Sequence, residues 1–218
     1  IYMMLSVGAS IHIVPDSYYV FPAKLIDYLS TQGISFLFWV PSILVNIANA
    51  RLLEDQALPN LRNVLFAGEA MPAKQLRYWM KNLPNTSFAN LYGPTEITVD
   101  CTFTKLTIDD IADDVVPIGK ACRNTEILIF NDDYQLCDVG EVGELCVRGS
   151  SLALGYWRLT ERTSEAFVQN PLHNDFRDLI YRTGDLCEWR ADGNILFHGR
   201  KDSQIKHMGY RIELGEIE

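Results

Sequence analysis

The sequence predicts an α/β fold with a parallel sheet flanked by helices, followed by a small antiparallel β-barrel-like subdomain. Two observations carry this prediction. In the first half of the chain, short apolar runs alternate with segments of helical periodicity, which is the pattern of βαβ units. Beyond Pro117, short strand-like runs are separated by turn residues. We divide the 218 residues into an α/β part (1–112), a barrel-like part (113–201) and a terminal piece (202–218).

In the first half, we expect strands at residues 9–14, 34–39, 63–67 and 86–91. Helical spacing covers residues 22–31, where Gly33 is placed to end the helix. Pro41 and Pro72 each follow an apolar run and open a further helix. Strands in such an arrangement are expected to be buried on both faces of the sheet.

In the second half, each expected strand is short and bounded by turn residues. These strands cover residues 126–130, 143–149, 185–190 and 194–199. The turn at 191–193 predicts a hairpin between the last two. One helix is expected at 160–167, and residues 109–114 are expected to form a connecting loop.

Composition excludes several classes of protein. A net charge of -9 and a pI near 4.9 argue against a nucleic-acid-binding surface. Five cysteines without a CxxC pattern and four scattered histidines indicate reduced cytosolic thiols and no metal cluster. The first 14 residues are a poor signal peptide, and the apolar run at 34–45 is too short to span a bilayer. We expect a cytoplasmic protein that contacts no membrane.

The stretch FANLYGPTEITVD, residues 88–100, begins as a strand and ends in an aromatic ring, a bend and two oxygen-bearing side chains. Taken alone, it is typical of a surface turn. In open α/β sheets, however, ligands bind beyond the carboxyl ends of the strands. Gly68 and Glu69 follow the neighbouring strand and therefore lie at the same edge as Thr95 and Glu96. This placement favours a ligand site.

Four strings occur in one order along nearly the whole chain. They are NLYGPTE (90–96), GELCVRGSSLALGYW (143–157), YRTGDL (181–186) and GRKDSQIKHMGYRIELGEIE (199–218). Together they resemble the adenylate-forming (AMP-binding) superfamily. The resemblance is greatest to amino-acid adenylation domains. These occur in nonribosomal peptide synthetases and in stand-alone ligases of the D-alanine–carrier protein ligase type. One such string is weak, but four in sequence are very specific.

The resemblance implies ATP-dependent activation of an amino acid as aminoacyl-AMP, followed by transfer to the phosphopantetheine thiol of a carrier protein. The attacking carboxylate, with a pKa of about 3.5, is already ionised at neutral pH. No general base is then required, in agreement with a sequence that lacks Ser-His-Asp or Cys-His arrangements. Catalysis would come from alignment of the reactants and from neutralisation of phosphate charge.

For the first part of the ATP site, the resemblance places Tyr92 against adenine. Gly93-Pro94 would let the backbone approach the nucleotide. Thr95 would bind the α-phosphate, and Glu96 would hold Mg²⁺, which prefers oxygen ligands. Both are implied catalytic residues. The walls around adenine would be Gly68, Glu69, Ala70, Asn90 and Leu91.

The second part of the ATP site comes from the barrel-like half. Asp185 would accept hydrogen bonds from the ribose hydroxyls, although an Asp in a tight turn can equally cap that turn. Phe197 would pack against the nucleotide, and Arg200 would reach the ribose or a phosphate. Taken alone, Arg200 and Asp202 could belong to a solvated charged strand.

The last string corresponds to the family's hinge and lid. Asp202 matches the hinge, and Gly209 matches the loop that faces the carrier's pantetheine arm. Met208 departs from the Arg that is usual in peptide synthetases, which leaves the carrier contacts of this loop open. The family's phosphate loop and lid lysine are expected before Ile1 and after Glu218. We therefore expect a central piece of a larger enzyme, inactive by itself.

The substrate pocket implied by the resemblance is formed by residues at the ends of neighbouring strands and after the Tyr-Gly-Pro-Thr-Glu string. They are Phe38, Leu65, Ala67, Leu91, Val99 and Asp100. A mostly apolar pocket with one carboxylate predicts a small or polar amino acid rather than a large aromatic one. Asp100 could instead point away and bond to a neighbouring loop.

Two alternatives remain open from the sequence. An acyl- or aryl-CoA synthetase shares the Tyr-Gly-x-Thr-Glu core, and NLYGPTE with RIELGEIE leans toward amino-acid activation. A non-catalytic remnant is the other alternative, against which the intact Tyr92, Thr95, Glu96, Asp185 and Arg200 argue. The amino acid, the carrier, the pathway and the oligomeric state are not determined.

Overall fold

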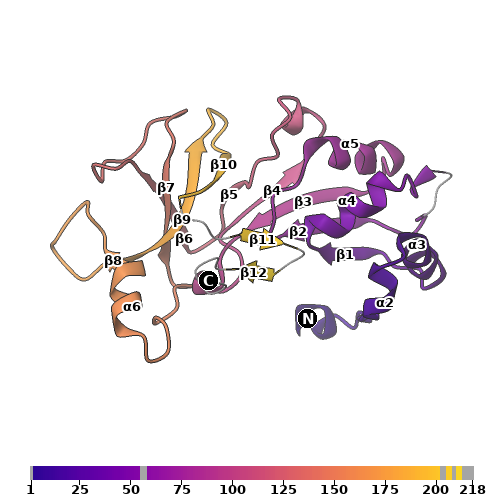
Figure 1. Cartoon of the computed structure of the whole chain (residues 1–218), viewed down its shortest axis with the longest axis horizontal. Coiled ribbons are helices and arrows are strands. Elements are labelled where there is room, and N and C mark those ends of the chain that lie inside the picture. Colours follow the sequence, from indigo (N-terminus) through magenta and orange to yellow (C-terminus); the bar gives the residue numbers. More distant parts are fainter. Residues whose placement is uncertain (1, 55–57, 202–204, 208–209, 213–218) are drawn as a thin grey trace.

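The computed structural model describes residues 2–54, 58–201, 205–207 and 210–212. Two sheets lie side by side in Figure 1: sheet A with its helices on the right, and sheet B on the left. A short antiparallel pair, β11 (Ile205–His207) and β12 (Tyr210–Ile212), follows them. The predicted hinge Asp202, together with Met208 and Gly209, lies outside the described residues.

Sheet A has the strand order β1-β2-β3-β4-β5. The strands are β1 (Phe36–Trp39), β2 (Asn63–Ala67), β3 (Ser87–Tyr92), β4 (Thr102–Leu106) and β5 (Lys120–Ala121). The first three are parallel, as the βαβ pattern predicts. Strands β4 and β5 are antiparallel and were not predicted, so the sheet is mixed. Through β5, sheet A also extends beyond the boundary expected at residue 112.

The helices of this half begin and end close to the predicted residues. They are α3 (Pro22–Thr31), α4 (Pro41–Asn49) and α5 (Ala73–Asn82), preceded by the short α1 (Tyr2–Ser6) and α2 (Asp16–Tyr19). Pro41 occupies the first turn of α4, whereas Pro72 is the N-cap of α5. Gly33 has a φ of 63°, in the left-handed region that ends helices.

The strand predicted at residues 9–14 is wrong. This segment has no regular secondary structure. Ile11 and Ile13, the two isoleucines of this run, are exposed to solvent. A strand needs a neighbour for its backbone groups, and no other described strand pairs with these residues.

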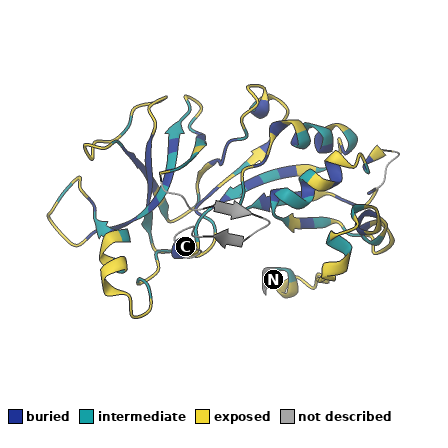
Figure 2. Ribbon diagram, viewed as in Figure 1, coloured by how far each residue is buried: buried dark blue, intermediate teal, exposed yellow. Residues whose placement is uncertain are grey.

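Only one face of sheet A is covered by the described helices, so the expected burial on both faces is wrong for this part of the chain. Val64, Phe66 and Phe88 point into a core shared with α3, α4 and α5. Deep in that core, the Trp79 indole N–H donates to the Leu44 carbonyl (2.9 Å). The other face is partly open: Phe38, for example, is 50% exposed. Figure 2 shows buried and less buried positions alternating along the strands.

Sheet B is an antiparallel half-barrel, which confirms the predicted second architecture. Its strands are β6 (Thr125–Phe130), β7 (Gly143–Gly149), β8 (Phe167–Gln169), β9 (Leu179–Trp189) and β10 (Ile195–Arg200). The single helix α6 (Thr160–Ala166) lies on its rim and is largely exposed (Figure 2). The connecting loop at 109–114 contains one 3₁₀ turn, η3 (Asp109–Ile111).

A bulge in β9 directs the predicted ribose-binding carboxylate. Glu144 pairs with Leu186 and Cys146 pairs with Arg182, so β9 carries extra residues between those partners. Gly184 has a φ of 72°, and the Thr183 hydroxyl donates to the Leu145 carbonyl (2.7 Å). Bulges change the direction of side chains. This one allows Asp185 to point toward sheet A.

A second core joins the two sheets. Strand β3 and the turn after it contribute Tyr92, Ile97 and Cys101. Sheet B contributes residues that include Tyr181 and Cys187. All five cysteines are free in the structure. None of the helices in the described residues combines the length and the apolar character needed to cross a bilayer.

Candidate functional site

The turn after β3 is tight and strained. Strand β3 ends at Tyr92, and the 3₁₀ turn η2 (Thr95–Ile97) follows Pro94. Thr98 and Val99 then adopt positive φ values of 61° and 82°, which β-branched residues rarely do. Such conformations cost about 1–3 kcal/mol each and concentrate at functional sites. The turn therefore carries backbone strain of the kind that is often found at functional sites.

Gly93 is required by the close return of the chain. A Cβ atom at this position would lie 2.4 Å from the Val99 carbonyl oxygen and 2.7 Å from the Asp100 Cα. The Cys101 N–H donates to the Tyr92 carbonyl (2.7 Å), which closes the turn. The sequence suggested that Gly93 admits a nucleotide. The structure supplies a further reason for glycine, because the chain packs here against its own backbone.

The carboxylate of Asp185 joins the two sheets at this edge. It accepts a short hydrogen bond from the Tyr92 hydroxyl. Arg200 Nη1 lies 2.6 Å from Asp185 Oδ1 and also donates to the Thr183 carbonyl (3.0 Å). Asp185 is 1% exposed. Burial, and then the nearby Asp185 charge, raises the pKa of Tyr92 well above its usual value, so the hydroxyl remains a donor.

Phe197 lies beside this cluster on β10. Its ring centroid is 6.4 Å from that of Tyr92, and the two rings are tilted by 37°. A planar heterocycle stacked between two rings needs about 7 Å between them, twice the contact distance of carbon atoms. The structure thus brings together Tyr92, Asp185, Phe197 and Arg200, four of the predicted ATP-binding residues.

Glu96 is buried and held from two directions. Its side chain is 5% exposed, and its Oε1 accepts a hydrogen bond from the Tyr156 hydroxyl (2.7 Å). Its carbonyl accepts from the Ala153 N–H (2.8 Å). The neighbouring Thr95 is exposed. A carboxylate and a hydroxyl, adjacent at the edge of the sheet, are ligands of the kind that Mg²⁺ prefers.

A metal site made by the chain alone is not present among the described residues, because no group of three or more His, Cys, Asp or Glu side chains converges there. Mg²⁺ usually binds through one or two carboxylates together with substrate phosphates. The residues present therefore fit Mg²⁺ as part of a nucleotide complex.

Two of the predicted adenine-wall residues have clear structural partners. The Glu69 carboxylate accepts from the Ser42 N–H (2.9 Å), in the first turn of α4. A negative charge is stabilising at that end of a helix. The Asn90 side chain is buried and donates to the Pro117 carbonyl (2.9 Å). Gly68, with a φ of 93°, and Ala70 stay at this edge of the sheet.

Four of the residues predicted to line the substrate pocket lie on the open face of sheet A. Strand register places Phe38 opposite Leu65 and Ala67 opposite Leu91. Side chains alternate between the faces of a strand, so these four share one face, whereas Asn90 points to the other. Val99 is exposed and lies in the turn that follows β3.

Asp100, the next residue of this turn, is half-buried. Burial raises its pKa above the usual value of 3.8. Among the described residues, no hydrogen bond and no charged partner contributes to this shift. The bond to a neighbouring loop that the sequence left open is therefore not seen in this part of the chain.

Two residues of this edge were missed by sequence reasoning. Phe103 lies opposite Leu91 in the β3–β4 register and is 50% exposed. Its strand was not predicted, although the alternation in residues 102–106 is a signal for one. Tyr156 belongs to one of the four strings, but no local signal indicates that it contacts Glu96, 60 residues earlier.

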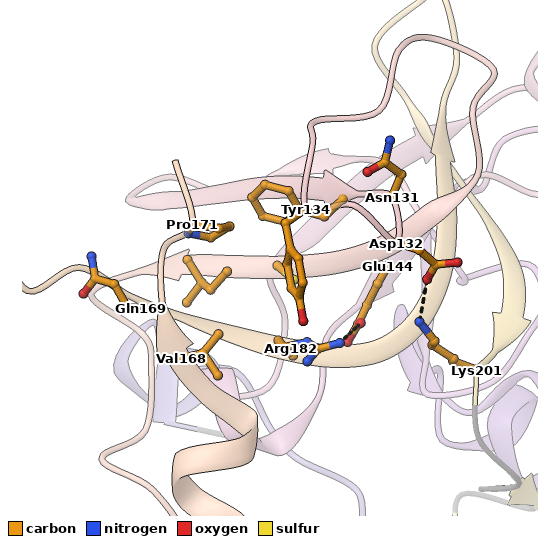
Figure 3. A pocket seen from close by; sticks show the side chains of 12 residues that line it. Asn131, Asp132, Tyr134, Glu144, Val168, Gln169, Pro171, Arg182 and Lys201 are labelled. Carbon is orange, nitrogen blue, oxygen red and sulfur yellow. Dashed lines mark hydrogen bonds and ion pairs between the residues drawn. The ribbon is translucent and has the colours of Figure 1, made fainter. Parts of the chain in front are cut away.

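A separate cavity of about 180 Å³ lies on sheet B. Figure 3 shows Tyr134 inside it, with two ion pairs at its edge: Arg182–Glu144 (2.6 Å) and Lys201–Asp132 (2.9 Å). Arg182 and Asp185 lie on opposite faces of β9. The cavity contains none of the predicted site residues.

Solved structures that match this fold include a nonribosomal peptide synthetase (NRPS) protein with an adenylation domain. The crystal structure of IdnL1 matches with a TM-score of 0.86 and 31% identity, over 98% of this chain and 44% of that one. PA1221, "an NRPS protein containing adenylation and PCP domains", matches with a TM-score of 0.80 and 30% identity. That match covers 90% of this chain and 39% of the other.

The family model for the AMP-binding enzyme matches residues 1–157, and the chain belongs to this family. Tyrocidine synthase 1 of Brevibacillus parabrevis is 38% identical over 217 residues, which are 100% of this chain and 19% of the relative. Gramicidin S synthase 1 of Brevibacillus brevis is 36% identical over 217 residues, again 100% of this chain and 19% of the relative. The chain thus spans less than a fifth of the length of these two relatives.

Proposed function

We propose that the protein containing this chain activates an amino acid with ATP as aminoacyl-AMP and passes it to the phosphopantetheine thiol of a carrier protein. The observation that carries the proposal is the hydrogen bond between Tyr92 and Asp185. It joins two of the four strings, 93 residues apart, beside Phe197 and Arg200. The peptide synthases among the relatives support amino acids, rather than fatty or aryl acids, as substrates.

In this proposal, the adenine ring lies between the rings of Tyr92 and Phe197. Their centroids are 6.4 Å apart and would have to separate only to about 7 Å to admit it. The ribose hydroxyls donate to Asp185 in place of the Tyr92 hydroxyl. Arg200 keeps the carboxylate in position through its ion pair. An aromatic pair and a buried acceptor would fix the nucleoside end of ATP.

At the phosphate end, Thr95 donates to the α-phosphate and Glu96 holds Mg²⁺. Bound Mg²⁺ neutralises charge on the phosphate oxygens. The substrate carboxylate is ionised at neutral pH, so the chain needs no base near this turn. Its contribution is alignment, which the strained and closely packed turn is suited to supply.

The open face of sheet A is proposed to hold the substrate side chain. Phe38, Leu65, Ala67 and Leu91 make this face apolar, and Asp100 adds a half-buried carboxylate near its end. A buried carboxylate is stable only when a polar or cationic group meets it. We therefore propose a small or polar amino acid as the substrate.

The test is pyrophosphate exchange by the complete protein with each common amino acid, with fatty and aryl acids as controls. We expect exchange with one amino acid or a few, dependence on Mg²⁺, and no exchange with the other acids. Loading of a phosphopantetheinylated carrier with the radiolabelled amino acid tests the second step. Exchange supported only by fatty or aryl acids would reject amino-acid activation, and a preference for Phe or Trp would reject the pocket assignment.

A further inference from the structure

The segment between β7 and α6 lies across the turn that carries Thr95 and Glu96. Besides the Ala153 bond to the Glu96 carbonyl, the Thr98 hydroxyl donates to the Ser151 carbonyl (2.8 Å). The Tyr156 hydroxyl donates to Glu96 Oε1 (2.7 Å). Three contacts from one segment of sheet B thus hold a strained turn of sheet A.

Tyr156 is itself fixed by α6 and the strand after it. Its N–H donates to the Thr163 hydroxyl (2.9 Å). Its ring packs edge-on against Phe167 at 5.9 Å, and the Arg162 guanidinium lies 5.2 Å from the ring centre. The preceding Gly155 has a φ of 130°, and a Cβ there would lie 2.4 Å from Thr163 Cγ2. The hydroxyl of Tyr156 is therefore delivered to Glu96 by a packed support.

We propose that Tyr156 is a positioning residue that orients the Glu96 carboxylate toward a Mg²⁺–nucleotide complex. The inference rests on the proposed function, because it requires Glu96 to be a metal ligand. Carboxylates that ligate metals are commonly oriented by hydrogen bonds from a second residue, and loss of such a bond lowers metal affinity about 10–100-fold. Tyr156 supplies this bond to Glu96 from the other sheet.

The test compares the complete wild-type protein with the Tyr156→Phe variant, which removes only the hydroxyl. Mn²⁺ replaces Mg²⁺, and its binding in the presence of α,β-methylene-ATP is titrated by electron paramagnetic resonance. We expect Tyr156→Phe to weaken Mn²⁺ binding about 10–100-fold. Binding of the nucleotide without metal should be unchanged. Tyr134→Phe removes a hydroxyl on the opposite face of sheet B and should leave Mn²⁺ binding unaltered.

Introducing Tyr156→Phe into the Glu96→Gln variant distinguishes positioning of the Glu96 carboxylate from general stabilisation of the fold. If Tyr156 acts through the Glu96 carboxylate, Tyr156→Phe should cause no further loss of Mn²⁺ affinity in Glu96→Gln. Equal Mn²⁺ affinity of Tyr156→Phe and wild type would overturn the inference, as would a lower melting temperature with unchanged affinity. Amino-acid-dependent pyrophosphate exchange by the wild type, measured in parallel, tests the proposed function separately.

Discussion

Asp185 shows how one buried carboxylate serves both the architecture and the candidate site. Its two oxygens contact Arg200 and Tyr92, so the carboxylate remains satisfied while it is almost completely hidden from water. A buried charge is stable only with such partners. The alternative that Asp185 merely caps its own turn does not account for these two contacts.

Asp185→Asn should destabilise the protein, because Arg200 would lose its buried ion pair with this carboxylate. Breaking a largely buried ion pair costs about 3 kcal/mol. We expect the melting temperature to fall by about 6–12 °C. The Michaelis constant for ATP should rise about tenfold or more. Asp132→Asn breaks an exposed pair with Lys201 and should change neither quantity. Equal effects of the two variants would contradict this account.

Asp100 should make stability depend on pH in the opposite sense to a paired carboxylate. Burial raises the pKa of Asp100 in the folded protein above its usual value of 3.8. At pH values between the usual pKa and the raised pKa, the folded protein therefore binds more protons than the unfolded chain. The contribution of Asp100 to stability therefore falls as the pH rises through that window. At pH 7 the ionised carboxylate remains partly desolvated in the folded protein.

Asp100→Asn should accordingly raise the melting temperature at pH 7 by a few °C, since the effect is at most about 1 kcal/mol. The gain should shrink as the pH falls through that window, because the wild-type carboxyl then takes up its proton in the folded protein. Thermal unfolding of both proteins across this range is the measurement. A loss of stability at pH 7 would show instead that Asp100 has a favourable partner in the complete protein.

At the scale of elements, the turn from Tyr92 to Cys101 determines where the candidate site lies. It reverses the chain from parallel β3 into antiparallel β4. The reversal depends on contact between Gly93 and the backbone of residues 99–101. Any side chain at residue 93 would force the backbone of Val99 and Asp100 to move.

Gly93→Ala should therefore cost about 3 kcal/mol, at the upper end of the range for overpacking, because backbone must move. Gly140→Ala is the matched control: Gly140 has a φ of 84° and nothing within 4 Å of an added Cβ. That change carries only the conformational penalty of about 1–2 kcal/mol. Denaturant unfolding measures both. Equal losses would mean that the turn can widen without cost.

At the scale of the whole molecule, the second core holds sheets A and B together. Cys101 and Cys187 lie in it, and Cys146 is buried in a smaller cluster of sheet B. Burial raises the pKa of the Cys146 thiol to about 12, and it raises those of Cys101 and Cys187 further. The thiolate is the reactive form of cysteine, so all three should be inert while the sheets stay packed.

Alkylation by iodoacetamide in the native state should therefore be confined to the half-buried Cys122 and Cys137. Their thiol pKa values are also raised by burial, so labelling should be slow at neutral pH. Peptide mapping by mass spectrometry, before and after unfolding in denaturant, distinguishes the five sites. Native labelling of Cys101 would indicate that the two sheets separate in solution.

The sequence by itself determined the βαβ order of the first half, the antiparallel character of the second and the candidate residues in four strings. These features depend on local periodicity, on proline and glycine positions and on short motifs. Only the tertiary structure decided that β4 is antiparallel and that residues 9–14 are not a strand, because strands require partners. It alone joined Tyr92 to Asp185 and Tyr156 to Glu96, 93 and 60 residues apart. No local pattern encodes the bulge, the strained turn and the packing that create those contacts.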